Sequence, residues 1–251
     1  MMLRIAAAFA LIATPALVTA QSNVIEEARA AYEDWDRRDE ARAMVASACE
    51  AGDSRACRAS LAELDNDYDK RTEARALAAR MCDGGDALAC VTLARYADDG
   101  VGGDIDQPLE RASLIAACRA GLGGACINAG QMAEMGEGGQ QDKPLARELA
   151  GLGCDAGDSR ACQFLGGYLN QDGWDAESDE ARDELWAQSR AAYQKGCEAG
   201  DPYSCTSFAG MLAEGKGGEE DRMRAMTILD EACKSDFYQC KERLEFERLG
   251  N

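Results

Sequence analysis

Apolar residues recur at helical spacing in short blocks along most of the chain. In one block Ala74, Leu77 and Met81 fall on one face of a helix. A second block follows after a short turn, and in it a small residue is often followed two positions later by a large one, as in Gly166 and Tyr168. Such alternation is typical of two helices in close contact. The pattern predicts antiparallel helix pairs.

Cysteines mark each predicted helix pair. The chain has 12 cysteines in six pairs, of which five are spaced C-x7-C, such as Cys82 and Cys90, and the last is C-x6-C. The first cysteines of successive pairs are 33, 36, 36, 43 and 36 residues apart. A period near 36 is the signature of a repeat array.

The residues between paired cysteines have the chemistry of one helix ending and the next beginning. A glycine lies three positions after the first cysteine in five repeats, where left-handed backbone is expected. An aspartate follows it in four repeats and suits the N-cap of the second helix. The glycines are Gly52, Gly85, Gly121, Gly157 and Gly200, and the aspartates are Asp53, Asp86, Asp158 and Asp201. The two cysteines should therefore lie close together across a helix hairpin.

The period also predicts the domain organisation. The repeats are expected at 38–66, 70–100, 107–136, 143–173, 184–215 and 221–251. About seven extra residues around 172–179 are expected to form a loop after the fourth repeat. Residues 21–37 are expected to form an N-terminal capping helix, and the irregular sixth repeat should cap the other end.

Residues 1–20 have the pattern of a secretory signal peptide. Arg4 precedes an apolar run from Ile5 to Val18, and small residues lead to Ala20. The alternative is an N-terminal membrane anchor, but the run is short for a spanning helix and contains Pro15. We expect cleavage after Ala20, no membrane insertion of the mature protein, and a periplasmic or secreted location.

The recurring element G-x-G-(V)-x-x-D…A…(A)C-x-x-G-x-x-x-A-C resembles the Sel-one-like repeat (SLR), a relative of the tetratricopeptide repeat, over nearly all of residues 38–249. The paired cysteines make the chain similar to the cysteine-rich Hcp-type secreted or periplasmic proteins. The resemblance implies an all-α fold, a right-handed α/α solenoid of about six disulfide-linked helix hairpins plus an N-terminal capping helix. It also implies a concave face that binds partners. Some Hcp-type relatives are described as binding or hydrolysing β-lactams, which the resemblance brings in as an alternative function.

Composition narrows the possible chemistry. The chain of 251 residues has 46 acidic and 27 basic residues, no histidine, and a formal net charge of −19. Without histidine there is no Ser-His-Asp triad, no Cys-His dyad and no His-ligated metal. The negative charge disfavours nucleic acids and anionic membranes. We expect a protein or peptide partner with a neutral or basic surface.

Three roles compete for the cysteines. Zinc sites use closer C-x2-4-C pairs and often histidine, and redox sites usually show C-x-x-C beside a βαβ unit. Structural disulfides fit better, because local pairing is the one scheme identical in each repeat and the signal peptide leads to an oxidising compartment. The predicted bonds are Cys49–Cys57, Cys82–Cys90, Cys118–Cys126, Cys154–Cys162, Cys197–Cys205 and Cys233–Cys240.

The sequence offers no candidate catalytic residue, cofactor or metal site. No serine has a lysine three positions on, as a penicillin-recognising serine enzyme would require. The acidic clusters at 98–106 and 219–221 lack the spacing of a calcium loop and are read as solvated surface.

Trp174 is the candidate contact for a partner, because it lies between Gly173 and Asp175 in the expected polar loop. Trp186 and Tyr193 are expected in the helix core. The sequence thus predicts an exported, non-catalytic scaffold that binds a protein or peptide in the cell envelope. The alternative is a β-lactam-binding or β-lactam-hydrolysing protein.

Overall fold

The computed structural model describes residues 15–235. Over this range the chain forms twelve α-helices and two short 3-10 turns, with no β-strand. It divides into two compact units, residues 1–77 and 78–251, and the boundary falls inside α4. The all-α fold predicted from the repeat pattern is confirmed.

Helices of the first repeats have a common length of 13 residues, as do most later ones. The helices are α1 Pro15–Glu33, α2 Arg38–Glu50, α3 Ser54–Asn66, α4 Arg71–Asp83, α5 Ala87–Asp99, α6 Gln107–Arg119, α7 Gly123–Met135, α8 Lys143–Asp155, α9 Ser159–Trp174, α10 Asp179–Glu198, α11 Pro202–Glu214 and α12 Arg222–Ser235. The 3-10 turns are Trp35–Arg37 and Tyr68–Lys70.

The first unit contains α1, which packs on α2, and α2, which packs on α3. Ala28, Ala31 and Ala41 form its small buried core, with Met44 and Val45 packed against them. Helix α1 runs through the expected cleavage point after Ala20. Residues 1–14 lie outside the described range, so the signal peptide stays a prediction.

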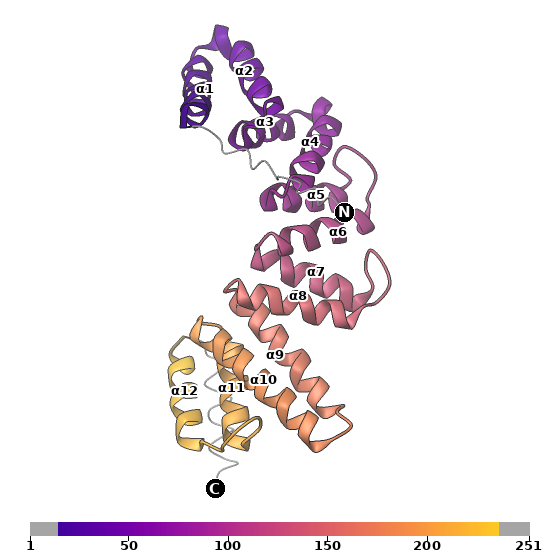
Figure 1. Cartoon of the computed structure of the whole chain (residues 1–251), viewed down its shortest axis with the longest axis vertical. Helices are drawn as coiled ribbons and strands as arrows, with labels where there is room; N and C mark the ends of the chain where they lie inside the picture. Colours follow the sequence, from indigo (N-terminus) through magenta and orange to yellow (C-terminus); the bar gives the residue numbers. More distant parts are fainter. Residues whose placement is uncertain (1–14, 236–251) are drawn as a thin grey trace, which may run out of the picture. The chain divides into compact units, whose positions relative to one another are not determined.

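In the second unit each helix from α5 to α12 packs against the next one along the chain (Figure 1). Helices also contact the second helix along: α6 contacts α8, α8 contacts α10, α7 contacts α9 and α9 contacts α11. The first helices of successive repeats therefore form one layer and the second helices another, which is the arrangement expected for stacked helix hairpins.

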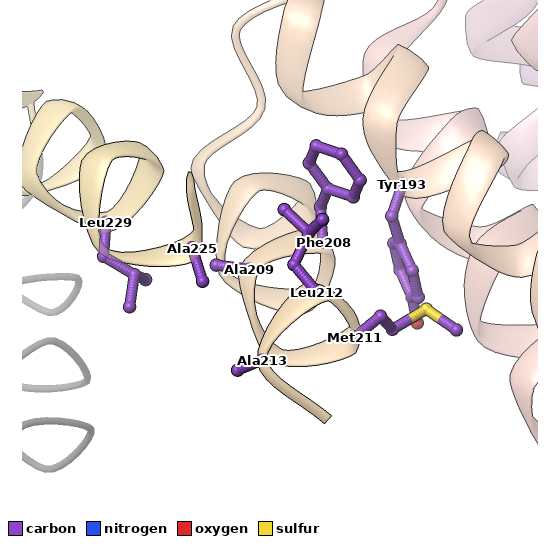
Figure 2. Packing of buried hydrophobic residues seen from close by; sticks show 8 residues of the cluster. All are labelled: Tyr193, Phe208, Ala209, Met211, Leu212, Ala213, Ala225 and Leu229. Carbon is purple, nitrogen blue, oxygen red and sulfur yellow. The ribbon is translucent and has the colours of Figure 1, made fainter. Parts of the chain in front are cut away.

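The core of the second unit is thin and rich in alanine, with larger side chains gathered near its C-terminal part. Figure 2 shows Tyr193 of α10 facing Met211 and Leu212 of α11, and Leu229 of α12 beyond them. Phe208 of α11 is 3% exposed in the same cluster. Trp186 is partly buried against this cluster, so the expectation that Trp186 and Tyr193 pack in the core is met.

The turn inside each hairpin follows the predicted cap chemistry. Gly52, for example, has a φ of +93°, and the equivalent glycines have φ between +87° and +94°. The carboxylate of Asp53 accepts hydrogen bonds from Arg55 N and Ala56 N at the start of α3. Asp86, Asp158 and Asp201 cap their helices in the same way.

These turns bring the paired cysteines together in each described hairpin. The five pairs Cys49–Cys57, Cys82–Cys90, Cys118–Cys126, Cys154–Cys162 and Cys197–Cys205 are disulfide-bonded. The Cα atoms of each pair are 4.4–4.5 Å apart. Cys233 is also disulfide-bonded, but its expected partner Cys240 lies outside the described residues.

Of the extra residues after the fourth repeat, only 175–178 form a loop. The others lengthen two helices, since α9 has 16 residues and α10 has 20. Helix α10 begins at Asp179, ahead of the start predicted for the fifth repeat at 184. Gly173, which the sequence suggested as a loop signal, lies inside α9, and the ring of Trp186 occupies the space where a side chain would be. A Cβ atom at Gly173 would lie 2.5 Å from Trp186 Cδ1.

Candidate partner-binding groove

An open groove of about 590 Å³ lies between α8, α9 and α10 in the second unit. Helices α8 and α10 are the first helices of the fourth and fifth repeats, so the groove opens on the layer of first helices. Its lining residues are Arg147 and Cys154 of α8, Leu165 and Leu169 of α9, and Leu185, Gln188, Ala191, Ala192 and Lys195 of α10. The lining is mainly apolar, as in most sites that bind organic ligands or peptides.

The close approach of α9 and α10 depends on a missing side chain. A Cβ atom at Gly166 would lie 2.7 Å from the ring of Tyr193. The buried hydroxyl of Ser189 donates a hydrogen bond to Gly166 O at 2.7 Å. Burial raises the pKa of the Tyr193 phenol. Gly166 therefore lets α10 lie against α9 and form one wall of the groove.

The two charged side chains that line the groove are both cationic. The Arg147 guanidinium donates to the carboxylate of Asp172 on α9. The Lys195 ammonium nitrogen lies 3.2 Å from Asp155 Oδ1, at the C-terminus of α8. These ion pairs connect neighbouring helices at separate places along the groove.

Arg147 belongs to a repeated position that the sequence interpretation missed. An arginine lies seven residues before the first cysteine in five repeats: Arg42, Arg75, Arg111, Arg147 and Arg190. Arg111 Nη1 donates to Gln140 O at 2.9 Å, and Arg190 Nη1 donates to Glu219 O at 3.1 Å. Both arginines hold the glycine-rich loop that follows the second helix of their repeat. The spacing to the cysteine could have revealed this position.

The lengthened α9 changes the partner of this arginine in the fourth repeat. The chain continues as helix where the third and fifth repeats have a glycine loop, and Arg147 pairs with a carboxylate of that helix instead. Arg111 is 8% exposed, whereas the side chain of Arg147 is 41% exposed and reaches the groove. Arg147 therefore pairs with α9 and lines the groove, and Arg190, which still holds a glycine loop, is part-exposed as well.

Trp174 lies at the end of α9 rather than in a loop, and it does not line the groove. Its side chain is exposed, as expected, at 58%. Its ring lies 5.1 Å from the ring of Trp186 in an edge-to-face arrangement. The ammonium of Lys216 is 4.6 Å from the centre of the Trp174 ring. Trp174 thus forms a second surface feature, an exposed ring supported by an aromatic and a cation.

Outside the groove, Glu110 of α6 is a carboxylate whose pKa is shifted by its surroundings. Burial raises the pKa of Glu110, and the nearby Asp98 and Glu137 raise it further. Within residues 15–235 no group of three or more acidic or cysteine side chains is arranged to hold a metal ion.

Comparisons with known proteins identify the fold. No family model matches the chain, and no curated protein matches it. Among solved structures, the chain is similar to a Sel1 repeat protein from Oxalobacter formigenes, with a TM-score of 0.60 and 16% identity over 88% of this chain. It is also similar to a protective antigen of uropathogenic Escherichia coli that displays an SLR fold, with a TM-score of 0.50 and 17% identity over 85% of this chain.

The chain spans 64% of the first of these structures and 53% of the second. At 16% and 17% sequence identity, the similarity to these two structures shows the fold alone. The protein has the Sel1-like repeat fold, a helical repeat scaffold, and the resemblance seen in the sequence is confirmed at that level.

The five disulfides that lie within residues 15–235 indicate an oxidising compartment outside the cytoplasm, because thiols are kept reduced in the cytosol. Among the helices of the described region, none combines the length and apolar character needed to cross a membrane.

Proposed function

We propose that this protein is an exported, non-catalytic scaffold that binds a protein or peptide partner in the cell envelope, in the periplasm or after secretion. The observation that carries the proposal is the open apolar groove between α8, α9 and α10. Each hairpin beside it is closed by a disulfide, so the groove is formed before a partner arrives. A preformed surface lowers the entropic cost of binding.

The formal charge of −19 supports a partner whose overall surface is neutral or basic. Long-range attraction of such a partner should weaken as salt is added. Trp174 is proposed as an additional contact outside the groove, because exposed aromatic side chains often contribute much of the energy of an interface. No observation in the structure favours β-lactam chemistry, which stays a hypothesis from the resemblance.

A site-specific photo-cross-linker tests the proposal in cells. It should be placed at Gln188, which is exposed and lines the groove, and as a matched control at Gln107, which is exposed on α6 and does not line it. We expect one defined envelope protein to be linked through position 188, at one segment of its sequence. Ala191→Trp, which fills the groove from an exposed position, should abolish that adduct. Equal adducts from both positions, or an adduct that survives Ala191→Trp, would count against the groove.

The role of Trp174 is tested by the Trp174→Ala variant in the same cross-linking experiment. Its ring is exposed but contacts Trp186 and Lys216, so its removal should cost about 1 kcal/mol of folding stability. We expect a weaker adduct at position 188 with only a small fall in the melting temperature. An unchanged adduct would exclude Trp174 from the interface.

A further inference from the structure

The charge and apolar character of the groove lining indicate which kind of peptide it binds. This inference rests on the proposed function. We infer that it binds an extended segment with acidic residues at positions i and i+4 and an apolar residue at i+2. The two acidic side chains would meet Arg147 and Lys195, and the apolar side chain would meet the leucines of the same lining.

The first step is the charge of the lining. Arg147 and Lys195 are the charged side chains that reach the groove, whereas Asp172 and Asp155 pair with them from outside the lining. A guanidinium has five N–H donors in a planar fork, and an ammonium has three. Each cation can therefore serve a second carboxylate while keeping its present one. A lysine or arginine brought into the groove would instead meet the same two cations and no carboxylate among the lining side chains.

The second step is the apolar part of the lining. Leu169 and Cys154 are buried, Leu165 and Leu185 are half-buried, and Ala191 is exposed. These side chains offer an apolar surface that an aliphatic side chain can cover. Burial of such a side chain stabilises a complex by about 1.5–3 kcal/mol before ordering costs.

The third step is the spacing. Lys195 is held at Asp155, which lies eight residues along α8 from Arg147. At a rise of 1.5 Å per residue this separation is about 12 Å along the helix. An extended peptide rises by about 3.3 Å per residue, so four residues cover the same distance. Residues i, i+2 and i+4 of an extended chain point to the same side. Taken as the separation of the two cationic groups, this spacing corresponds to acidic–x–apolar–x–acidic.

The overall negative charge of the protein limits this preference to two acidic residues. Exposed charges separated by more than about 8 Å are largely screened at physiological salt, so the cations in the groove dominate at contact. Further acidic residues outside the groove would face the acidic surface. The predicted partner thus has a short acidic–apolar segment in an otherwise neutral or basic protein.

Fluorescence anisotropy with short labelled peptides on the oxidised protein tests the inference. The probe contains E-A-L-A-E, and three controls contain K-A-L-A-K, Q-A-L-A-Q and the permuted A-E-L-E-A, which keeps the charge but halves the spacing of the acids. Since hydrogen bonds to charged groups contribute about 1.5–3 kcal/mol, we expect the probe to bind at least about tenfold tighter than each control. Its affinity should also fall as salt is raised.

Two matched protein variants locate the contact. Lys195→Gln removes a groove cation whose side chain is 60% exposed and bridges two helices. Arg119→Gln removes a cation outside the groove that is 59% exposed and bridges to Glu148. Both change the net charge equally. We expect Lys195→Gln to weaken probe binding about tenfold and Arg119→Gln to change it less than twofold.

The outcomes separate the inference from the proposed function. Equal or tighter binding of the lysine, glutamine or permuted peptide in the groove would overturn the charge pattern while supporting a peptide-binding groove. Equal effects of the two variants would also overturn it. If no peptide binds at millimolar concentration the inference is wrong, and cross-linking at Gln188 then decides the proposed function independently.

Discussion

The disulfides should contribute unequally to stability although they close equal segments. The test compares two double variants, Cys154→Ala/Cys162→Ala and Cys49→Ala/Cys57→Ala. Each pair is separated by eight residues in sequence. The chain-entropy cost of losing either bond is therefore the same, about 2.6 kcal/mol of unfolding free energy for a nine-residue loop.

Burial makes the difference. Cys154 and Cys162 are 5% and 2% exposed and pack with Ile127 and Ala161. Cys49 and Cys57 are only half-buried. We call Cys154–Cys162 the inner pair and Cys49–Cys57 the outer pair. If each buried sulfur contributes about as much as a buried methylene group, removing the inner pair costs a further 1–2 kcal/mol of unfolding free energy, to about 4 kcal/mol in total.

Native-state hydrogen exchange measures these losses locally, which suits a chain with two compact units. Amides of α8 and α9 should lose protection in the inner variant, and amides of α2 and α3 in the outer variant. The free energy of opening measured by exchange should fall by about 1–2 kcal/mol more in the inner-pair variant than in the outer-pair variant. A larger loss from the outer pair would refute the burial argument. A melting curve of the native protein that is unchanged in strong reductant would refute the structural role of the disulfides altogether.

Three further predictions concern other parts of the molecule. Gly166→Ala should destabilise the protein by about 1–3 kcal/mol in urea unfolding, because the added Cβ would lie 2.7 Å from the Tyr193 ring. The control Gly151→Ala, whose added Cβ would have no atom within 4 Å, should be neutral or stabilising by up to about 1 kcal/mol. Because the folded-state pKa of Glu110 is raised above 4.5, stability should fall as pH rises from 4.5 through the raised pKa. Glu110→Gln should remove that dependence and raise the free energy of unfolding by about 0.2–0.5 kcal/mol at pH 7, seen as a higher urea midpoint. Below pH 4.5 the native protein and the variant should have the same stability. The control Glu148→Gln should give no such gain. The oxidised protein should not turn over a chromogenic β-lactam, and turnover that follows the purified folded protein would establish the alternative function.

The repeat architecture could be predicted from local chemistry. A glycine three residues after Cys49 and an aspartate after that glycine define the end of one helix and the start of the next. Both signals act over a few residues, and they correctly predicted the turns and their caps. The cysteine spacing then predicted bonds that the structure contains.

The loop predicted around Gly173 and Trp174 was wrong at these two residues, which lie in α9. Gly173 suggested a loop, but it lies in α9, where its missing side chain leaves room for the Trp186 ring. The contact joins residues 13 positions apart on two helices, so no local pattern predicts it. Trp174 was consequently placed in a loop, although its exposure was predicted correctly.

The sequence by itself determined the helix hairpin, its caps and the cysteine pairing of the five hairpins that lie within residues 15–235, because each of these depends on residues close together in the chain. The tertiary structure alone decided that the extra residues lengthen α9 and α10. It also decided that Arg147 pairs with Asp172 and lines the groove, and that the mainly apolar lining includes two cations. These features arise where three helices meet. Their side chains come from positions up to 48 residues apart, and only the packing of one hairpin on the next brings them together.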